Sequence, residues 1–131
     1  GTSRVLIYDH AGDFVRAVGS YGDGLGQFAR PRGVAVDREG ILYAVDAAFE
    51  NVQMFDEQGR LLLFFGGPYT GPGDMWLPAQ ISVHYEGIDA FQPLVAPGYR
   101  LEYVVLVANQ FGPDRVSVYG RVILDTGPVT P

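Results

Sequence analysis

The sequence predicts an all-β protein built from repeated antiparallel sheets, and three observations support this prediction. β-branched and aromatic residues dominate the short apolar runs, and the 131 residues include 18 glycines and 9 prolines, as a fold with many turns requires. No window holds apolar residues at the i, i+3, i+4, i+7 spacing of an amphipathic helix. The third observation is that two stretches of the chain recur at a fixed offset of 47 residues.

The recurrence covers both apolar runs and the loops between them. Residues 5–12 reappear as 52–59, and residues 26–36 reappear as 73–83. A period in the forties, with short apolar runs between turn residues, is typical of a propeller blade or a similar stacked unit. The fold class that we predict is therefore all-β, and more specifically part of a β-propeller.

Alternating apolar runs bounded by turn residues predict nine strands. In chain order they cover residues 3–9, 13–18, 32–37, 41–46, 51–56, 60–65, 79–84, 101–108 and 115–124. Residues 37–40 and 56–59 both have the pattern Asp-x-x-Gly, in which glycine supplies the positive φ of a tight turn. The longer connections 19–30 and 66–77 are rich in glycine and aromatic residues, and the repeat predicts that they are equivalent loops between one blade and the next.

The nine strands group into about two and a half four-stranded blades. The end of one blade occupies residues 1–19, a complete blade 31–66 and a third blade 78–124, with a tail at 125–131. The second and third strands of the third blade match at offsets of 63 and 64, which indicates an insertion at about 85–100. An irregular insertion of this kind is either a surface cap of the blade or a functional element.

One whole blade resembles an NHL repeat, and the likeness continues in degenerate form into both flanking blades. It is carried by residues 31–37, 40–46, 51–56, 59 and 65–66. The arginine usual before the third strand is missing at Asn51, although Arg4 and Arg115 keep it. The resemblance implies a β-propeller, most often of six blades, that recognises a protein or another ligand through loops on one face.

The last portion of the chain, from Tyr103 to Tyr119, is similar to secreted bacterial NHL proteins. That similarity implies an extracytoplasmic location, periplasmic or extracellular, in a bacterium. Some relatives of this kind accompany multihaem cytochromes, so the resemblance also implies such a cytochrome as a partner.

Composition excludes several classes of site. The formal net charge is −6 and the chain contains no lysine, so nucleic acid is a poor general partner, and the RNA binding of some animal NHL proteins is not expected. The absence of cysteine removes disulfides, thiol catalysis, zinc–cysteine sites and iron–sulfur clusters. No apolar run reaches the 18 or so residues of a membrane span.

The residues that often carry catalysis or metal binding do not form a recognisable site in the sequence. His10 and His84 are the only histidines and fall at different blade positions, and the aspartates that end strands are interpreted as caps of turns. The glycines of 22–26 precede a strand, whereas a phosphate-binding loop precedes a helix. We therefore predict no catalytic residue, no metal and no cofactor. The alternative is a propeller lyase or hydrolase with a metal in its central channel.

Recognition is the function that remains. The loops that join one blade to the next share a face with the loops between the second and third strands of each blade. Phe28 and Met75 occupy equivalent repeat positions there and are predicted to fill the space between blades. Aromatic and arginine side chains on a rigid surface are typical of a protein-binding hot spot. The exposed contributors that we predict are Arg30, Arg32, Trp76 and Phe111.

Two and a half blades cannot close a ring, because each blade buries its faces against its neighbours. The sequence therefore predicts that the chain is a piece of a longer protein. The alternative is a ring completed by another copy of the chain. In either case, the remaining blades would cover two apolar faces and several strand edges.

Overall fold

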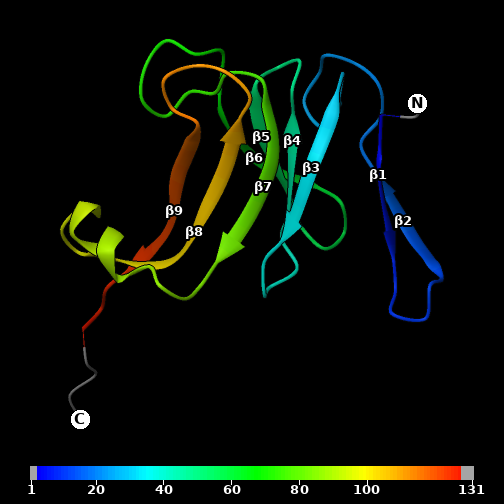
Figure 1. The fold of residues 1–131 in the computed structure, drawn as a ribbon. Coiled ribbons are helices and arrows are strands. Elements are labelled where there is room, and N and C mark those ends of the chain that lie inside the picture. The colour runs from blue at the N-terminus through cyan, green and yellow to red at the C-terminus, as the bar shows by residue number, and fades with distance from the viewer. Residues whose placement is uncertain (1–2, 128–131) are drawn as a thin grey trace.

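The computed structural model describes residues 3–127 and consists of three antiparallel β-sheets arranged side by side (Figure 1). The first sheet contains β1 (Val5–Tyr8) and β2 (Phe14–Val18). The second contains, in spatial order, β3 (Pro31–Val36), β4 (Leu42–Asp46), β5 (Asn51–Phe55) and β6 (Leu61–Gly66). The third contains β7 (Pro78–His84), β8 (Tyr99–Asn109) and β9 (Val116–Leu124).

This arrangement confirms the prediction of an all-β fold made of partial propeller blades. Within residues 3–127, one blade has four strands, one has three and one has two. We call the sheets blades one, two and three in chain order. Residues 1–2, in the predicted first segment, and residues 128–131, in the predicted tail, lie outside the described part of the chain.

The predicted insertion at 85–100 differs from the structure at one boundary. Tyr99 and Arg100 belong to β8, because β9 continues far enough to pair with them at Leu124 and Ile123. The rest of the insertion contains a 3₁₀ helix, η1 (Asp89–Leu94). It is held to the strand by Gln92, whose Oε1 accepts the N–H of Leu101 at 2.8 Å.

Aspartate-capped turns connect neighbouring strands, as the sequence predicts. In each turn the aspartate Oδ1 accepts backbone N–H groups from the residues two and four positions later, at 2.8 to 3.0 Å. The glycine three positions later has a φ of +81° to +88°. The turns begin at Asp9, Asp37 and Asp56 and their glycines are Gly12, Gly40 and Gly59.

The hydrophobic core lies between the sheets rather than within one of them. Between blades one and two it contains Val18, Phe28, Leu42, Ala44 and Phe55. Between blades two and three it is larger, and its buried members are Tyr43, Val45, Val52, Met54, Met75, Ile81, Tyr103, Val105 and Val107. Each blade therefore depends on its neighbours for stability, as stacked repeats do.

Blades two and three approach most closely where β3 lies against β7. A Cβ atom on Gly33 would come within 2.8 Å of the carbonyl oxygen of Ala79 and 2.9 Å of the Cα of Gln80. Both neighbours are backbone atoms, so a side chain at this position would push the two strands apart. The glycine is therefore required by the packing of one blade on the next.

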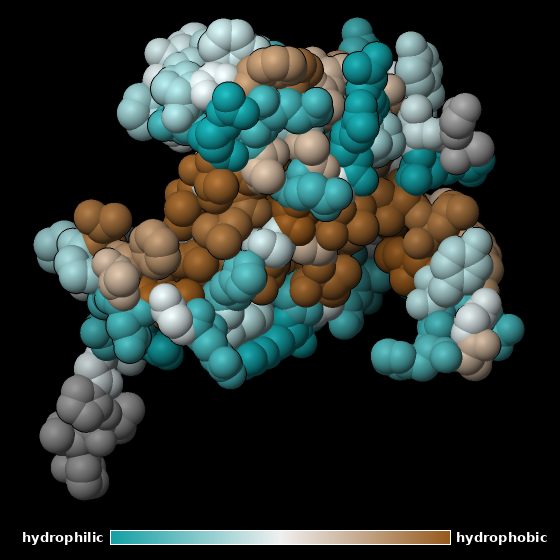
Figure 2. Space-filling model, in the orientation of Figure 1, coloured by the Kyte–Doolittle hydropathy of each residue, from teal (hydrophilic) through white to brown (hydrophobic). Residues whose placement is uncertain are grey.

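The outer faces of the stack remain apolar and exposed. Val34 and Val36 of β3 lie on the face toward blade one, which has only two strands among the described residues and leaves these side chains exposed. On blade three, at the opposite end of the row of sheets, Val118, Val122 and Leu124 of β9 are exposed. Figure 2 shows hydrophobic residues gathered across the middle of this view, with polar residues above and below. In the described part of the chain, no helix has the length and apolar character needed to cross a membrane.

Candidate recognition face

The loops that enter blades two and three have the same internal construction, offset by 47 residues. Gly19 and Gly66 both have a φ of +84°, and a large side chain packs directly over each of them. These side chains are Phe28 and Met75, both completely buried. Phe28 belongs to the core between blades one and two and Met75 to the core between blades two and three, which confirms the prediction that the two residues fill the space between blades.

Asp46, at the end of β4, fixes the position of Arg30. Its buried carboxylate accepts the N–H of Ala29 at 2.7 Å and that of Arg30 at 3.2 Å, on the loop that leads into β3. It also accepts the N–H groups of Ala48 and Phe49, at 2.9 and 3.1 Å, on the following loop. One carboxylate thus ties together two loops on the upper end of the sheets in Figure 1.

Asn109, at the end of β8, holds the corresponding position in blade three. Its Oδ1 accepts the N–H of Trp76 at 3.2 Å. Its Nδ2 donates to the carbonyl oxygen of Asp114 at 2.8 Å and to the Ser117 hydroxyl at 2.9 Å. Asn109 therefore supports the backbone of Trp76 in the way that Asp46 supports the backbone of Ala29 and Arg30.

The structure brings Trp76 and Phe111 together in blade three. The N–H of Phe111 donates to the carbonyl oxygen of Trp76 at 3.4 Å. The Trp76 ring stacks on Tyr69, with centroids 6.1 Å apart and planes at 28°, and the Tyr69 hydroxyl donates to Asp114 at 3.1 Å. Trp76 is 44% exposed and Phe111 is 53% exposed. The result is an aromatic cluster, Tyr69, Trp76 and Phe111, that is held in place and open to solvent.

Arg30 and Arg32 are also exposed, but they lie at the same end of blade two. Neither guanidinium forms an ion pair within residues 3–127. The two halves of the face are joined by Glu50, whose Oε2 accepts the N–H of Leu77 at 2.9 Å, next to Trp76. All four predicted residues therefore lie at one end of the sheets, in two groups on adjacent blades.

A buried polar network lies towards the opposite end of the same blade interface, and the sequence did not indicate it. The hydroxyl of Tyr103 donates to Asp37 at 2.7 Å, and the hydroxyl of Tyr43 is hydrogen-bonded to that of Tyr103. Since the single Tyr103 proton is given to the carboxylate, Tyr43 is the donor to Tyr103. Arg121 lies 3.8 Å from Asp37 and 3.3 Å from Glu102.

This network predicts a loss of stability in alkali. Burial raises the pKa of both Tyr43 and Tyr103 above the usual value of 10.0. A pKa that is higher in the folded chain stabilises the fold fully below about pH 10, and this contribution is lost as the pH rises further. We expect the free energy of unfolding, measured in urea between about pH 8 and 11, to fall above about pH 10. Tyr103→Phe should reduce that fall, and an identical pH profile in the variant would contradict the assignment.

The two histidines take no part in a multi-residue centre. His10 lies in the exposed turn after β1, and the Nε2 of His84 is 2.8 Å from the Ser82 hydroxyl on β7. Within residues 3–127, no three His, Cys, Asp or Glu side chains are placed to share a metal ion. The strand-ending aspartates are engaged in capping turns and loops, as described above.

The sequence indicated that Asp46, like the other strand-ending aspartates, accepts backbone N–H groups, but it did not indicate that Asn109 supports Trp76. Asp46 and Asn109 each stand at the end of a buried strand, and their alignment at an offset of 63 residues was a usable signal. Tyr69 follows a proline, and the residue at the equivalent repeat position in the loop 19–30 is not aromatic. Its stacking on Trp76 therefore had no signal in the repeat.

Comparison with known proteins gives one informative similarity. No family model matches the chain. The chain is similar to Protein brain tumor of Drosophila melanogaster, with 27% identity over 106 residues, which is 81% of this chain and 10% of that protein. The chain thus spans about a tenth of the length of the curated relative it matches. The similarity agrees with an NHL-type propeller.

Proposed function

We propose that the chain is a non-enzymatic recognition module that binds a protein through the end of the sheets that carries Arg30, Arg32, Trp76 and Phe111. The observation that carries this proposal is the exposed aromatic cluster of blade three, fixed from below by Asn109 and Asp114. Tryptophan, tyrosine and arginine contribute most to binding when they stand on a rigid surface, because little conformational entropy is lost on association.

The two arginines suit an acidic or carbonyl-rich partner surface. Their guanidinium groups have no carboxylate partner in the described part of the chain, although the chain as a whole has a net charge of −6. A planar guanidinium binds carboxylates in a bidentate manner, which adds geometric specificity to the apolar contact of Trp76 and Phe111. We expect the arginines to orient the partner and the aromatic cluster to supply most of the affinity.

Several finer features belong to the same proposal and are supported by the resemblance alone. They are a six-bladed NHL propeller, an exported bacterial location, and a multihaem cytochrome as the partner. Completion of the ring requires the remaining blades or another copy of the chain. The exposed apolar outer faces of blades two and three support this requirement.

Substitution of Trp76 tests the proposed face. A partner obtained by affinity capture would be purified, and its affinity for wild-type chain and variants measured by calorimetry. We expect Trp76→Ala to weaken binding at least tenfold or so, because truncation of an aromatic hot spot costs about 2 kcal/mol or more. Leu94→Ala, on the exposed insertion at the other end of the sheets, is the matched control and should bind as the wild type does. Unchanged affinity in Trp76→Ala and in Arg30→Ala would place the partner elsewhere.

A further inference from the structure

The loop between β2 and β3 (Figure 1) contains Asp23 followed by Gly24, and no other aspartate or asparagine in the sequence precedes a glycine. In such a pair the backbone nitrogen of the glycine can attack the side-chain carboxyl carbon of the aspartate. Glycine hinders this attack least, because it has no side chain. Both residues are exposed to solvent. The loop therefore carries the pair of residues in this chain that is best suited to isomerisation of the backbone.

The isomerisation needs water and no other reagent. The Gly24 nitrogen forms a bond to Cγ of the protonated Asp23 side chain, the nitrogen loses its proton, and the carboxyl hydroxyl leaves with that proton as water. The product is a cyclic succinimide. Addition of water at the main-chain carbonyl carbon of Asp23 then breaks the bond from that carbon to the Gly24 nitrogen, and the backbone runs through the β-carbon of an isoaspartate. The water lost in the first step is regained in the second.

Gln27 holds both backbone groups of Gly24 in the folded chain. The side-chain Oε1 of Gln27 accepts the N–H of Gly24 at 2.9 Å, and the N–H of Gln27 donates to the carbonyl oxygen of Gly24 at 3.1 Å. The Gly24 nitrogen has to give up its proton and turn toward the Asp23 side chain before the ring can close. Since the hydrogen bond to Oε1 must break first, its free energy adds to the barrier of the reaction.

The packing of Gln27 also explains why glycine follows Asp23. A Cβ atom on Gly24 would lie 2.9 Å from the Oε1 of Gln27, and one on Gly22 would collide with the same side-chain amide. Gln27 is fixed from its other side by Gln53, a buried residue of β5, whose Nε2 donates to the Gln27 carbonyl oxygen at 2.8 Å. The position of Gln27 thus requires the glycine that makes the pair reactive, and the same side chain restrains the reactive nitrogen.

The equivalent loop of blade three has the same turn without the reactive pair. The repeat offset places Thr70 where the first loop has Asp23, and Gly71 follows it. The N–H of Asp74 donates to the carbonyl oxygen of Gly71 at 3.2 Å, as the N–H of Gln27 does to its glycine in the first loop. The turn therefore forms with threonine in the first position, and the carboxyl group of Asp23 is not needed for it.

We propose that Asp23 is a site of spontaneous isoaspartate formation, and that Gln27 slows the reaction by holding the N–H of Gly24. The modification takes place in the chain by itself and does not depend on the proposed binding of a protein. Its rate is set by how often the hydrogen bond between Gln27 and Gly24 opens. The site therefore records the age of the chain and the integrity of this loop.

The product alters a loop that is closed by backbone hydrogen bonds. The N–H of Gly22 donates to the carbonyl oxygen of Phe28 at 3.1 Å, and the N–H of Phe28 donates to that of Ser20 at 2.8 Å. Isoaspartate adds a methylene group to the main chain between these bonds. Because Phe28 is buried between blades one and two, the longer loop disturbs a core residue. We expect the modified chain to be less stable than the unmodified one.

Incubation in water enriched in heavy oxygen detects the reaction. The wild-type chain is kept at neutral pH, its peptides are mapped by mass spectrometry, and ring opening introduces the label at residue 23. Isoaspartate is then identified by its resistance to a protease that cleaves before aspartate. We expect label at Asp23 and far less at every other aspartate. A synthetic peptide of residues 19–30, which lacks the folded hydrogen bond, should react at least about fivefold faster than the chain.

Three variants of the loop separate the role of Gln27 from a general disturbance. Gln27→Ala should raise the rate at least about fivefold, whereas Gln27→Glu keeps an acceptor oxygen and should stay within about twofold of the wild type. Ser20→Ala removes the other side-chain contact of Gln27, at 3.4 Å from Nε2 to the hydroxyl, and should also stay within about twofold. Circular dichroism verifies that the variants are folded.

Asp23→Thr reproduces the residue found in the equivalent loop and should abolish labelling at this position. After equal incubation, the wild-type chain should unfold at a lower urea concentration than Asp23→Thr, in proportion to its isoaspartate content. The same midpoint in both aged chains, with isoaspartate present in the wild type, would contradict the effect on the core.

Three results would overturn the proposed site. They are faster labelling at another aspartate, equal rates in the folded chain and in the peptide of residues 19–30, and equal rates in Gln27→Ala and the wild type. Acceleration by Ser20→Ala as large as that by Gln27→Ala would also contradict the role of the hydrogen bond to Gly24. The comparison of chain and peptide decides the question even if Gln27→Ala does not fold.

Discussion

Replacing Asp46 by alanine is expected to lower the free energy of unfolding by about 3 kcal/mol or more. The carboxylate is completely buried, and four backbone N–H groups from two loops depend on it. Removing the acceptor leaves these donors without a partner, and an unsatisfied buried donor costs about 1 to 3 kcal/mol. Urea denaturation followed by circular dichroism measures the loss.

Asp46→Asn is the matched control for this prediction. An asparagine, Asn109, occupies the corresponding position in blade three and still accepts the N–H of Trp76. The amide keeps one acceptor oxygen, so the loss should be clearly smaller than for alanine. Equal destabilisation by the two substitutions would mean that packing, and not hydrogen bonding, is what Asp46 provides.

Gly33→Val is expected to destabilise the chain to a similar extent, by about 3 kcal/mol. A Cβ at this position would lie 2.8 Å from a carbonyl oxygen of β7, closer than any non-bonded contact allows. Because the neighbouring atoms are backbone, they cannot move aside without separating blades two and three. The separation would also open the larger of the two core clusters to water.

The control for Gly33→Val is Gly71→Val, on the loop between the two blades. A Cβ on Gly71 would meet nothing within 4 Å, so its substitution should change the free energy of unfolding by less than about 0.5 kcal/mol. Comparable stability of Gly33→Val and the wild type in a thermal melt would show that β3 and β7 do not lie against each other.

The repeat explains why so much of the fold was predictable from the sequence. The 47-residue offset aligns Gly19 with Gly66 and Phe28 with Met75. In the structure the two glycines have the same φ, and Phe28 and Met75 are both completely buried. Strand periodicity and Asp-x-x-Gly turns then define the elements within each blade. Arg30, Arg32, Trp76 and Phe111 are exposed, and their role in recognition stays a prediction.

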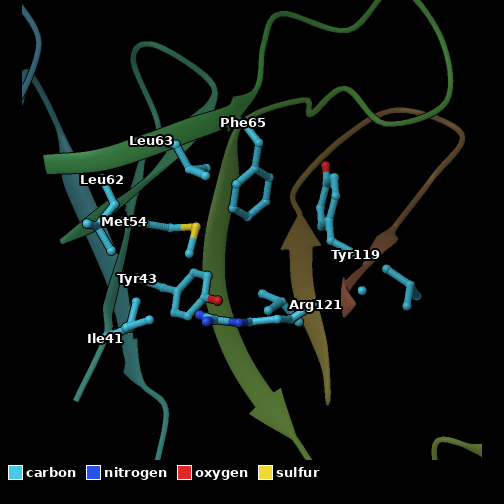
Figure 3. Close-up of a pocket in the computed structure, with 11 residues that line it drawn as sticks. Ile41, Tyr43, Met54, Leu62, Leu63, Phe65, Tyr119 and Arg121 are labelled. Carbon is cyan, nitrogen blue, oxygen red and sulfur yellow. The ribbon is translucent and has the colours of Figure 1, made fainter. Parts of the chain in front are cut away.

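Contacts between non-equivalent positions of adjacent blades were beyond prediction. The hydroxyl of Tyr43 is hydrogen-bonded to that of Tyr103, which donates to Asp37. No two of these three residues are equivalent positions of the repeat. The length of β9, which brings Arg121 into the network (Figure 3), follows from pairing with an extended β8. Such features arise from tertiary packing and leave no local pattern.

Nuclear Overhauser effects across blades two and three are the most direct test of the side-by-side arrangement of the sheets. Gly33 lies against the backbone of β7, and a Cβ atom added to it would be 3.1 Å from the backbone nitrogen of Ile81. We expect a strong effect between the Gly33 Hα and the Ile81 amide proton, and further effects between the rings of Tyr43 and Tyr103. A folded chain that shows neither, while keeping the cross-strand effects within each sheet, would contradict the stacking of the blades.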